Sequence, residues 1–348
     1  MRIGLLTTSF PRAPGDYAGS FVGDRVEQLL ARGHAVDVLA AGDGSEPAAP
    51  PPAGALTVTR VPSAPPGRAP LFYGAGAPEM LERGGVATLL AAARFSAALA
   101  AAAAERVAGW DVVEAHWLVP SALVALSVAP RLPRRAYGHS GDVALLERIP
   151  FGGALARQLV RGETDLRFVT EALRERFAAL AGRRVGRVVE LPAPPTVFAP
   201  RRGGPDHTLR RGLGLDAPTL LAVGRLVPIK GHAGLLHACA RVRASGAQAE
   251  LVILGDGPER RRLEHGAREL GVPLRLPGFV SRAEVARWLH AADVYVQPSI
   301  VLSNGRREGA PLATVEARAV GIPVVVESDP GLLAGAIASA IGASVRPA

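Results

Sequence analysis

A single lysine marks the segment of this chain best suited to binding phosphate. Of the 40 lysine and arginine residues only Lys230 is a lysine, and it lies in the segment GRLVPIKG at 224–231, directly after an apolar run. Its ammonium group on a flexible stem can reach one phosphate oxygen, whereas arginine binds as a rigid fork. Arg225 and Lys230 together indicate a diphosphate site at the end of a predicted strand. A solvated loop residue is the commoner case for an isolated lysine.

Two glutamates form the second candidate set. Glu308 and Glu316 stand eight positions apart, and Pro311 between them is typical of a helix start. This spacing places Glu308 in the loop before the helix and Glu316 about one and a half turns inside it. The two carboxylates can hold different hydroxyls of one ligand, while the helix N-terminus faces its anionic part. Acidic pairs on helices are usually solvated, but the flanking EGAP and GIPVV segments make this pair specific.

Strands and helices alternate twice along the chain, which predicts parallel βαβ units in both halves. The fold class is therefore α/β, with two Rossmann-like domains facing each other across a cleft. We expect domains at 1–195 and 196–348, joined by a proline-rich hinge at 191–207. His116 and His139 each follow a predicted strand, at the end where such sheets bind ligands. The predicted strands are 2–6, 35–40, 56–61, 111–115, 135–137, 219–223, 250–254, 274–276, 294–297 and 322–326, and the first helix is 24–32.

Composition limits the classes of protein to which such a site could belong. The 348 residues are 48% hydrophobic and 20% charged, as expected for a two-domain globular chain. The single cysteine, Cys239, is expected to be buried, and its lack of a partner favours a reducing compartment. The alanine-rich segment 86–104 carries Arg94 and is predicted to be a soluble amphipathic helix, not a membrane span.

Several other functions are disfavoured. A net charge of +9 is spread over both halves and is not interleaved with aromatic residues, so we expect no specific binding of nucleic acid. No Gly-x-Gly-x-x-Gly follows the first strand, which argues against NAD chemistry. Neither a Walker A motif, nor a zinc spacing, nor an Asp-x-Asp pair is present, and we expect no metal and no cofactor.

Motifs in a fixed order give the chain a family resemblance. In the second half they are GRL at 224–226, KG at 230–231, LVILGDGP at 251–258, PGFV at 277–280, ADVYVQPS at 292–299 and the two framed glutamates. In the first half they are SFP at 9–11, GSF at 19–21, GHAV at 33–36, AHW at 115–117 and HSGD at 139–142. The chain resembles a family 4 retaining glycosyltransferase, the glycosyl transferase group 1 type, which has the GT-B fold.

This resemblance implies roles for the second-half residues. Arg225 and Lys230 would clamp the diphosphate of a nucleotide sugar and stabilise the leaving group without a metal. Glu316 would accept hydrogen bonds from the ribose, and Glu308 would face hydroxyls of the donor sugar. The backbone of Gly309, Ala310, Pro311 and Leu312 would also line the donor site. Its N–H groups, which Pro311 lacks, would donate to phosphate or sugar.

The resemblance also implies roles for first-half residues. His116 would contact the donor sugar near the reacting carbon, although a core histidine beside Trp117 is the competing interpretation. Gly19 and Ser20 would belong to a first loop that meets phosphate or acceptor, with a plain turn as the alternative.

The implied activity is transfer of a hexosyl unit from a nucleotide sugar, which is the donor substrate, to an acceptor hydroxyl with retention of configuration. The expected partners are this donor and a glycan or glycolipid acceptor, in the assembly of a cell-surface polysaccharide or glycolipid. The expected location is cytoplasmic, with peripheral contact at the inner face of a membrane. The rival hypothesis is a protein that binds nucleotide sugar or anionic glycan through a degenerate, non-catalytic site.

The sequence departs from the family pattern after Val326. The family continues with a glycine-rich loop and long helices that return to the first domain, whereas here one alanine-rich helix runs to Ala348. The second domain is therefore expected to be shortened, leaving either a reduced but active enzyme or a chain that binds donor poorly.

Overall fold

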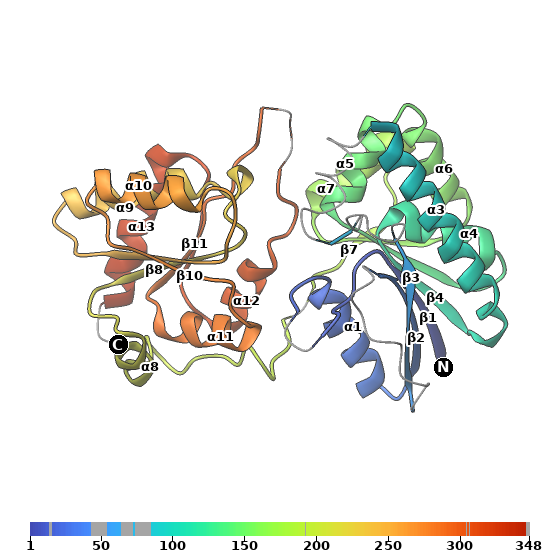
Figure 1. Cartoon of the computed structure of the whole chain (residues 1–348), viewed down its shortest axis with the longest axis horizontal. Helices are drawn as coiled ribbons and strands as arrows, with labels where there is room; N and C mark the ends of the chain where they lie inside the picture. The colour runs from blue at the N-terminus through green and yellow to red at the C-terminus, as the bar shows by residue number, and fades with distance from the viewer. Residues whose placement is uncertain are drawn as a thin grey trace. The chain divides into compact units, whose positions relative to one another are not determined.

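The chain forms two compact units, Met1–Leu191 and Pro192–Ala348. The computed structural model describes residues 1–13, 16–42, 54–63, 72–73, 85–191, 193–303, 305 and 307–345. Each unit contains a parallel β-sheet with helices packed against it (Figure 1). The proline-rich segment expected to link the domains includes Pro192, which lies outside the described residues.

The first unit is built on a seven-stranded sheet with the order β3-β2-β1-β4-β5-β6-β7, in which every neighbouring pair is parallel. The order reverses between β1 and β4, so this is the topological switch point where open α/β sheets bind ligands. The five strands predicted in this half are confirmed as β1 to β5. The strands are β1 (Arg2–Thr7), β2 (Ala35–Gly42), β3 (Leu56–Pro62), β4 (Val112–His116), β5 (Arg134–Gly138), β6 (Asp165–Phe168) and β7 (Arg187–Val188).

The first helix, α1 (Ser20–Ala31), begins four residues before the predicted start at Asp24. Gly19 adopts the left-handed conformation at its N-cap, with φ of 70°, and lets the chain turn sharply into the helix. Val22, Val26 and Leu29 form its buried stripe. The other α-helices of this unit are α3 (Gly85–Ala104), α4 (Leu123–Val128), α5 (Ser140–Arg148), α6 (Gly152–Arg161) and α7 (Glu171–Ala181).

Helix α3 is the alanine-rich helix expected from the sequence. Its residues Phe95, Leu99 and Ala103 are buried, whereas Leu89 and Leu90 are exposed. By length and composition alone, the window Ala87–Ala104 could cross a membrane, and 22% of that window is buried within the protein. The soluble amphipathic interpretation stays a prediction.

The second unit has a five-stranded parallel sheet with the order β10-β9-β8-β11-β12. Its switch point lies between β8 and β11. All five predicted strands are present. They are β8 (Thr219–Val223), β9 (Glu250–Leu254), β10 (Leu274–Gly278), β11 (Val294–Gln297) and β12 (Val324–Val326), and the α-helices are α8 (His207–Leu213), α9 (His232–Ala244), α10 (Arg260–Glu269), α11 (Arg282–Ala291), α12 (Leu312–Val320) and α13 (Pro330–Val345).

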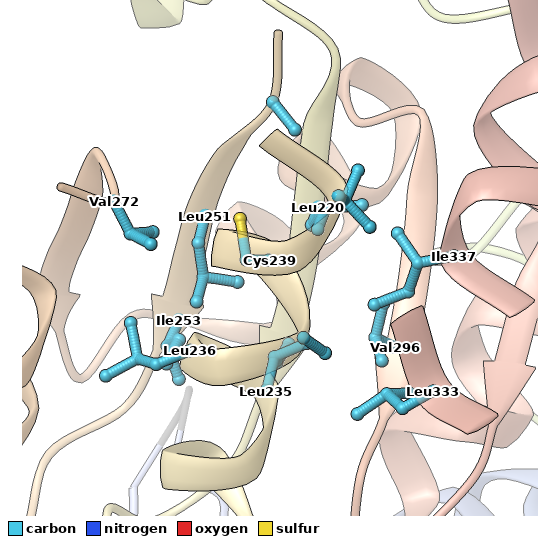
Figure 2. Close-up of a cluster of buried hydrophobic side chains, with 14 of the residues drawn as sticks. Leu220, Leu235, Leu236, Cys239, Leu251, Ile253, Val272, Val296, Leu333 and Ile337 are labelled. Carbon is cyan, nitrogen blue, oxygen red and sulfur yellow. The ribbon is translucent and has the colours of Figure 1, made fainter. Parts of the chain in front are cut away.

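One face of this sheet is covered by α9 and α13, which pack against each other. Leu235 and Cys239 of α9 join Leu333 and Ile337 of α13 in a buried apolar cluster over strand residues such as Leu251 (Figure 2). Burial also raises the pKa of the Cys239 thiol to about 11. Cys239 is therefore a small core residue, as predicted.

Two adjacent leucines of α13 provide a matched test of this packing. Leu333 is 1% exposed and Leu332 is 64% exposed. We expect Leu333→Ala to lower the free energy of unfolding of the second unit by about 2–5 kcal/mol, because it removes buried contacts and leaves a cavity. Leu332→Ala should change it by less than about 0.5 kcal/mol. Urea unfolding of both variants measures the difference, and equal effects would contradict the described orientation of α13.

Candidate functional site

The loop between β8 and α9 carries Lys230, and two glycines allow this loop to pack closely. Gly224 has φ of 154°, and a Cβ there would lie 2.8 Å from Cε of Lys230. Gly231 has φ of 69°, and a Cβ there would lie 2.0 Å from the carbonyl oxygen of Pro298. Both positions therefore need glycine to let the loop pass close to the lysine side chain and to the segment after β11. Arg225 lies half-buried in the same loop.

Lys230 forms an ion pair with Glu308, in which its Nζ donates to Oε1. Both side chains are largely buried, at 15% and 20% exposure. The other carboxylate oxygen, Oε2, accepts hydrogen bonds from Nε2 of Gln297 at 3.1 Å and from Oγ of Ser299. The sequence predicted Lys230 and Glu308 separately, and the structure brings them into direct contact. The structure also places Gln297 and Ser299 beside Glu308. In the sequence both residues stand only within the motif at 292–299.

The loop and helix start that follow Glu308 are placed as predicted, with one difference. Pro311 is the N-cap of α12 instead of its first residue, and Leu312 begins the helix. The cap supplies no side-chain hydrogen bond, and the first turn carries no acidic residue. The N–H groups of this turn therefore form an electropositive end that suits an anion or a polar hydroxyl. Gly309 and Ala310 lead into it from Glu308.

Glu316 lies inside α12 and is 7% exposed. Its Oε1 accepts hydrogen bonds from Arg282, at 3.1 Å from Nε and 2.8 Å from Nη2. The guanidinium of Arg282 lies 5.2 Å from the ring centroid of Phe198. Arg282 thus orients the carboxylate predicted to bind ribose. Arg282 could not be predicted as a site residue, because it lies 34 positions from Glu316 and no local pattern connects the two.

A pocket of about 320 Å³ opens beside Glu308, at the carboxyl ends of β11 and β12. This volume is at the low end for a small-molecule site. Its lining combines carboxylates, hydroxyls and apolar side chains from Gln297, Ser299, Ile300, Val301, Arg307, Glu308, Gly309, Pro311, Val326, Glu327 and Ser328.

In the first unit, His116 ends β4 and is fully buried. Its ring stacks on Tyr137, with centroids 4.5 Å apart and planes 1° apart. Neither ring nitrogen has a hydrogen-bond partner among the described residues. Burial, followed by the positive charges of Arg25 and Arg167, lowers the pKa of His116 to about 3. The imidazole is therefore neutral at physiological pH and carries one donor and one acceptor.

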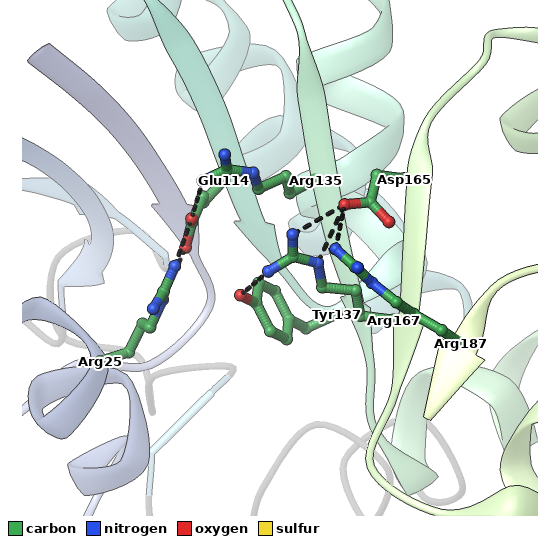
Figure 3. Close-up of polar contacts among 7 residues, drawn as sticks. All are labelled: Arg25, Glu114, Arg135, Tyr137, Asp165, Arg167 and Arg187. Atoms are coloured by element: carbon green, nitrogen blue, oxygen red, sulfur yellow. Dashed lines mark hydrogen bonds and ion pairs between the residues drawn. The ribbon is translucent and has the colours of Figure 1, made fainter. Parts of the chain in front are cut away.

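An arginine-rich network supports this stack on the same face of the sheet (Figure 3). Nη1 of Arg167 donates to the Tyr137 hydroxyl at 2.7 Å, and Asp165 binds Arg167 and Arg187 at 2.7 Å and 2.9 Å. Fully buried Glu114 binds Arg25 at 2.7 Å and Arg135 at 2.9 Å. The network thus holds Tyr137, on which His116 stacks, and its positive charges add to the burial that keeps His116 neutral.

Gly19 and Ser20 lie at the N-terminus of α1, which follows β1 at the switch point. A Cβ on Gly19 would lie 2.4 Å from the carbonyl oxygen of Ser9, so the turn needs glycine. The ring of Phe21 in the same turn lies 6.0 Å from that of His116. The structure thus brings Gly19, Ser20 and His116 to one edge of the first sheet.

The remaining motif residues of this unit, His139 and Asp142, cap α5. Asp142 accepts hydrogen bonds from the backbone N–H groups of Leu118 at 2.6 Å, His139 at 2.9 Å and Val143 at 2.8 Å. Burial raises the pKa of Asp142 to about 7, and these donors oppose the rise. Asp142 therefore holds the backbone after β4 against the start of α5.

The predicted residues fall into two groups, one at the switch point of each sheet. Gly19, Ser20 and His116 form the first group. The second group lies in Pro192–Ala348 and comprises Arg225, Lys230, Glu308, Gly309, Ala310, Pro311, Leu312 and Glu316.

Similarity to solved structures defines the class of fold. Sucrose-phosphate synthase of Thermosynechococcus elongatus superimposes with a TM-score of 0.71 at 21% identity, over 98% of this chain and 90% of that one. HepE of Anabaena, solved with UDP and glucose, superimposes with a TM-score of 0.63 at 16% identity. The superposition covers 99% of this chain and 94% of HepE. The chain has the GT-B fold predicted from its sequence, with two parallel sheets.

Sequence comparison identifies the family. Residues 208–347 match the model of the glycosyl transferases group 1. The protein of Salmonella typhimurium provisionally named colanic acid biosynthesis glycosyltransferase WcaL is 37% identical over 146 residues, which are 40% of this chain and 36% of that protein. A GDP-mannose-dependent alpha-(1-6)-phosphatidylinositol monomannoside mannosyltransferase of Mycolicibacterium smegmatis is 30% identical over 238 residues, 64% of this chain and 60% of that one. Residues 208–347 therefore match a group 1 glycosyltransferase domain, in agreement with the resemblance seen in the motifs of this half.

Acid destabilisation tests the buried, neutral state of His116. Its pKa falls from 6.5 to about 3 on folding, so the unfolded state binds more protons between these values. The free energy of unfolding should therefore decrease as the pH falls from about 6.5 towards 3, by about 1.4 kcal/mol per pH unit for each such histidine. His116→Phe keeps a ring on Tyr137 and should make this dependence shallower in urea titrations, while buried His139 and His232, whose pKa values are also lowered by burial, keep their contributions.

His265 provides the control for this experiment, because its side chain is 67% exposed. The His265→Gln variant should lose stability with acid about as the wild type does, because it retains His116. A His116→Phe variant that destabilises with acid as steeply as the wild type would contradict the neutral, buried state of His116.

Proposed function

We propose that this chain is a retaining glycosyltransferase that moves a hexosyl unit from a nucleotide sugar to an acceptor hydroxyl. The observation that carries this proposal is the contact between the only lysine and Glu308 at the switch point of the second sheet. A cation for phosphate and a carboxylate for hydroxyls meet there beside the N-terminus of α12. A nucleotide sugar carries its diphosphate directly beside its sugar hydroxyls, so a cation and a carboxylate must lie close together to bind both.

In this mechanism Lys230 and Arg225 bind the diphosphate and stabilise the charge that develops as the bond from C1 to the phosphate oxygen breaks. The metal-independent character of the reaction follows from these cations, which supply the positive charge themselves. Glu308 accepts hydrogen bonds from the donor sugar, and Glu316, oriented by Arg282, accepts them from the ribose. The backbone from Gly309 to Leu312 contributes further donors.

Retention of configuration is proposed to result from attack on the same face of the sugar. The acceptor oxygen forms the new bond to C1, the bond from C1 to phosphate breaks, and the acceptor proton passes to the departing phosphate. None of the glutamates acts as a covalent nucleophile, in contrast to a retaining glycosidase. Neutral His116 contacts the donor sugar near C1, and Gly19 and Ser20 contact phosphate or acceptor.

The names of the relatives support the proposed setting. One is named for colanic acid biosynthesis and another as a mannosyltransferase acting on a phosphatidylinositol monomannoside. A glycan or glycolipid acceptor in cell-surface polysaccharide or glycolipid assembly is therefore our proposal for this chain. We propose a cytoplasmic location with peripheral contact at the inner face of a membrane, for which the exposed apolar residues of α3 are suited.

Donor binding is tested by thermal unfolding with a panel of UDP-, GDP- and ADP-sugars. A ligand at about a hundred times its dissociation constant stabilises the folded state by about 2.7 kcal/mol. One class of donor should raise the melting temperature of the wild type. Lys230→Met and Glu316→Gln should abolish the rise, because they remove the phosphate and ribose contacts.

Two exposed residues supply matched controls. Arg184→Met and Glu269→Gln alter side chains that are 69% and 64% exposed, and both should retain the ligand-induced rise. The rival hypothesis, a non-catalytic binding protein, predicts the same stabilisation but no turnover. Release of nucleoside diphosphate on adding acceptor extract separates the two, and a chain that binds donor without such release would contradict the transferase proposal.

A further inference from the structure

A buried hydrogen-bond chain leads from the core of the second unit to Glu308. The hydroxyl of fully buried Tyr295 donates to Oε1 of Gln297 at 2.5 Å, and Oγ1 of Thr314 donates to the same oxygen at 3.3 Å. Burial raises the pKa of Tyr295 well above its ordinary value, so the phenol keeps its proton and remains a donor. Two donors on one oxygen fix which end of the Gln297 amide faces the core.

The other end of the Gln297 amide faces the site. Nε2 donates to Oγ of Ser299 at 2.6 Å and to Oε2 of Glu308 at 3.1 Å. Because Ser299 already accepts from Gln297, its own hydroxyl proton is directed to Oε2 of Glu308. Gln297 and Ser299 thus both donate to Oε2 of Glu308, and the other carboxylate oxygen, Oε1, is bound by Lys230.

We propose that Gln297 is a positioning residue that keeps Glu308 in place for the donor sugar when Lys230 leaves it for the diphosphate. This inference rests on the proposed function. Lys230 forms an ion pair with Glu308. When the diphosphate arrives, Lys230 turns to it and Oε1 of Glu308 becomes able to accept a hydrogen bond from a sugar hydroxyl. Gln297 and Ser299 prevent the carboxylate from following the ammonium.

This arrangement separates recognition of the sugar from recognition of the nucleotide. The chain from Tyr295 through Gln297 to Glu308 acts on the sugar contact alone, because the diphosphate is bound by Lys230. The pocket lined by Gln297, Ser299 and Glu308 is where the sugar would lie. A donor with a free hydroxyl opposite Oε1 is therefore favoured over the matching deoxy sugar.

The experiment compares the affinities of Gln297→Leu and wild type for two ligands, the preferred nucleotide sugar and the corresponding nucleoside diphosphate, by calorimetry. Loss of one hydrogen bond to a charged group should weaken nucleotide-sugar binding roughly tenfold. Diphosphate binding should stay unchanged. In a Glu308→Gln background the further change Gln297→Leu should have little effect, because Gln297 acts through Glu308. Gln158→Leu, on an exposed position of α6, is the control and should change neither affinity.

Three outcomes would overturn the inference. Equal weakening of both ligands would show a general structural effect of Gln297. A tenfold loss that persists in the Glu308→Gln background would show that Gln297 acts by another route. Unchanged nucleotide-sugar affinity in Gln297→Leu would show that it does not position Glu308. If Gln297→Leu does not fold, Ser299→Ala removes the other donor to Oε2 and should give the same selective loss. Failure of the wild type to bind any nucleotide would instead contradict the proposed function itself.

Discussion

The ion pair between Lys230 and Glu308 is the interaction on which the arrangement of the second unit's site depends. Placing both charges where they are only 15% and 20% exposed carries a desolvation cost. Hydrogen bonds from Gln297 and Ser299 offset this cost on the carboxylate. Gly224 and Gly231 let the lysine loop approach closely enough for the pair to form. The proposed function requires Lys230 to exchange this carboxylate partner for a phosphate.

Parallel sheet topology accounts for where the functional groups lie. In each unit the strand order reverses once, and the candidate residues follow the strands on either side of that reversal. The two edges differ in charge. In the second unit a cation and carboxylates meet, whereas in the first unit burial and nearby arginines keep His116 neutral. A neutral imidazole suits contact with sugar hydroxyls, and a cation suits a diphosphate.

Apolar runs made most strands predictable from the sequence, and the spacing of the two glutamates made their positions predictable. Ten strands, the loop position of Glu308 and the helical position of Glu316 were all predicted. Strands β6 and β7 were missed because one is four residues long with arginine in it and the other has two exposed residues. The pairing of Arg282 with Glu316 and the role of Gln297 depend on contacts between segments distant in sequence, which no local pattern records.

In the proposed mechanism Lys230 exchanges Glu308 for the diphosphate of a nucleotide sugar, and the amino-acid composition of the chain allows a direct test. Because Lys230 is the only lysine, protein prepared with isotope-labelled lysine gives a single side-chain signal in NMR spectra. This signal should shift in Glu308→Gln measured without nucleotide, and it should shift in the wild type when nucleotide sugar or nucleoside diphosphate is added. An unmoved signal at a nucleotide-sugar concentration that saturates the protein by calorimetry would contradict it.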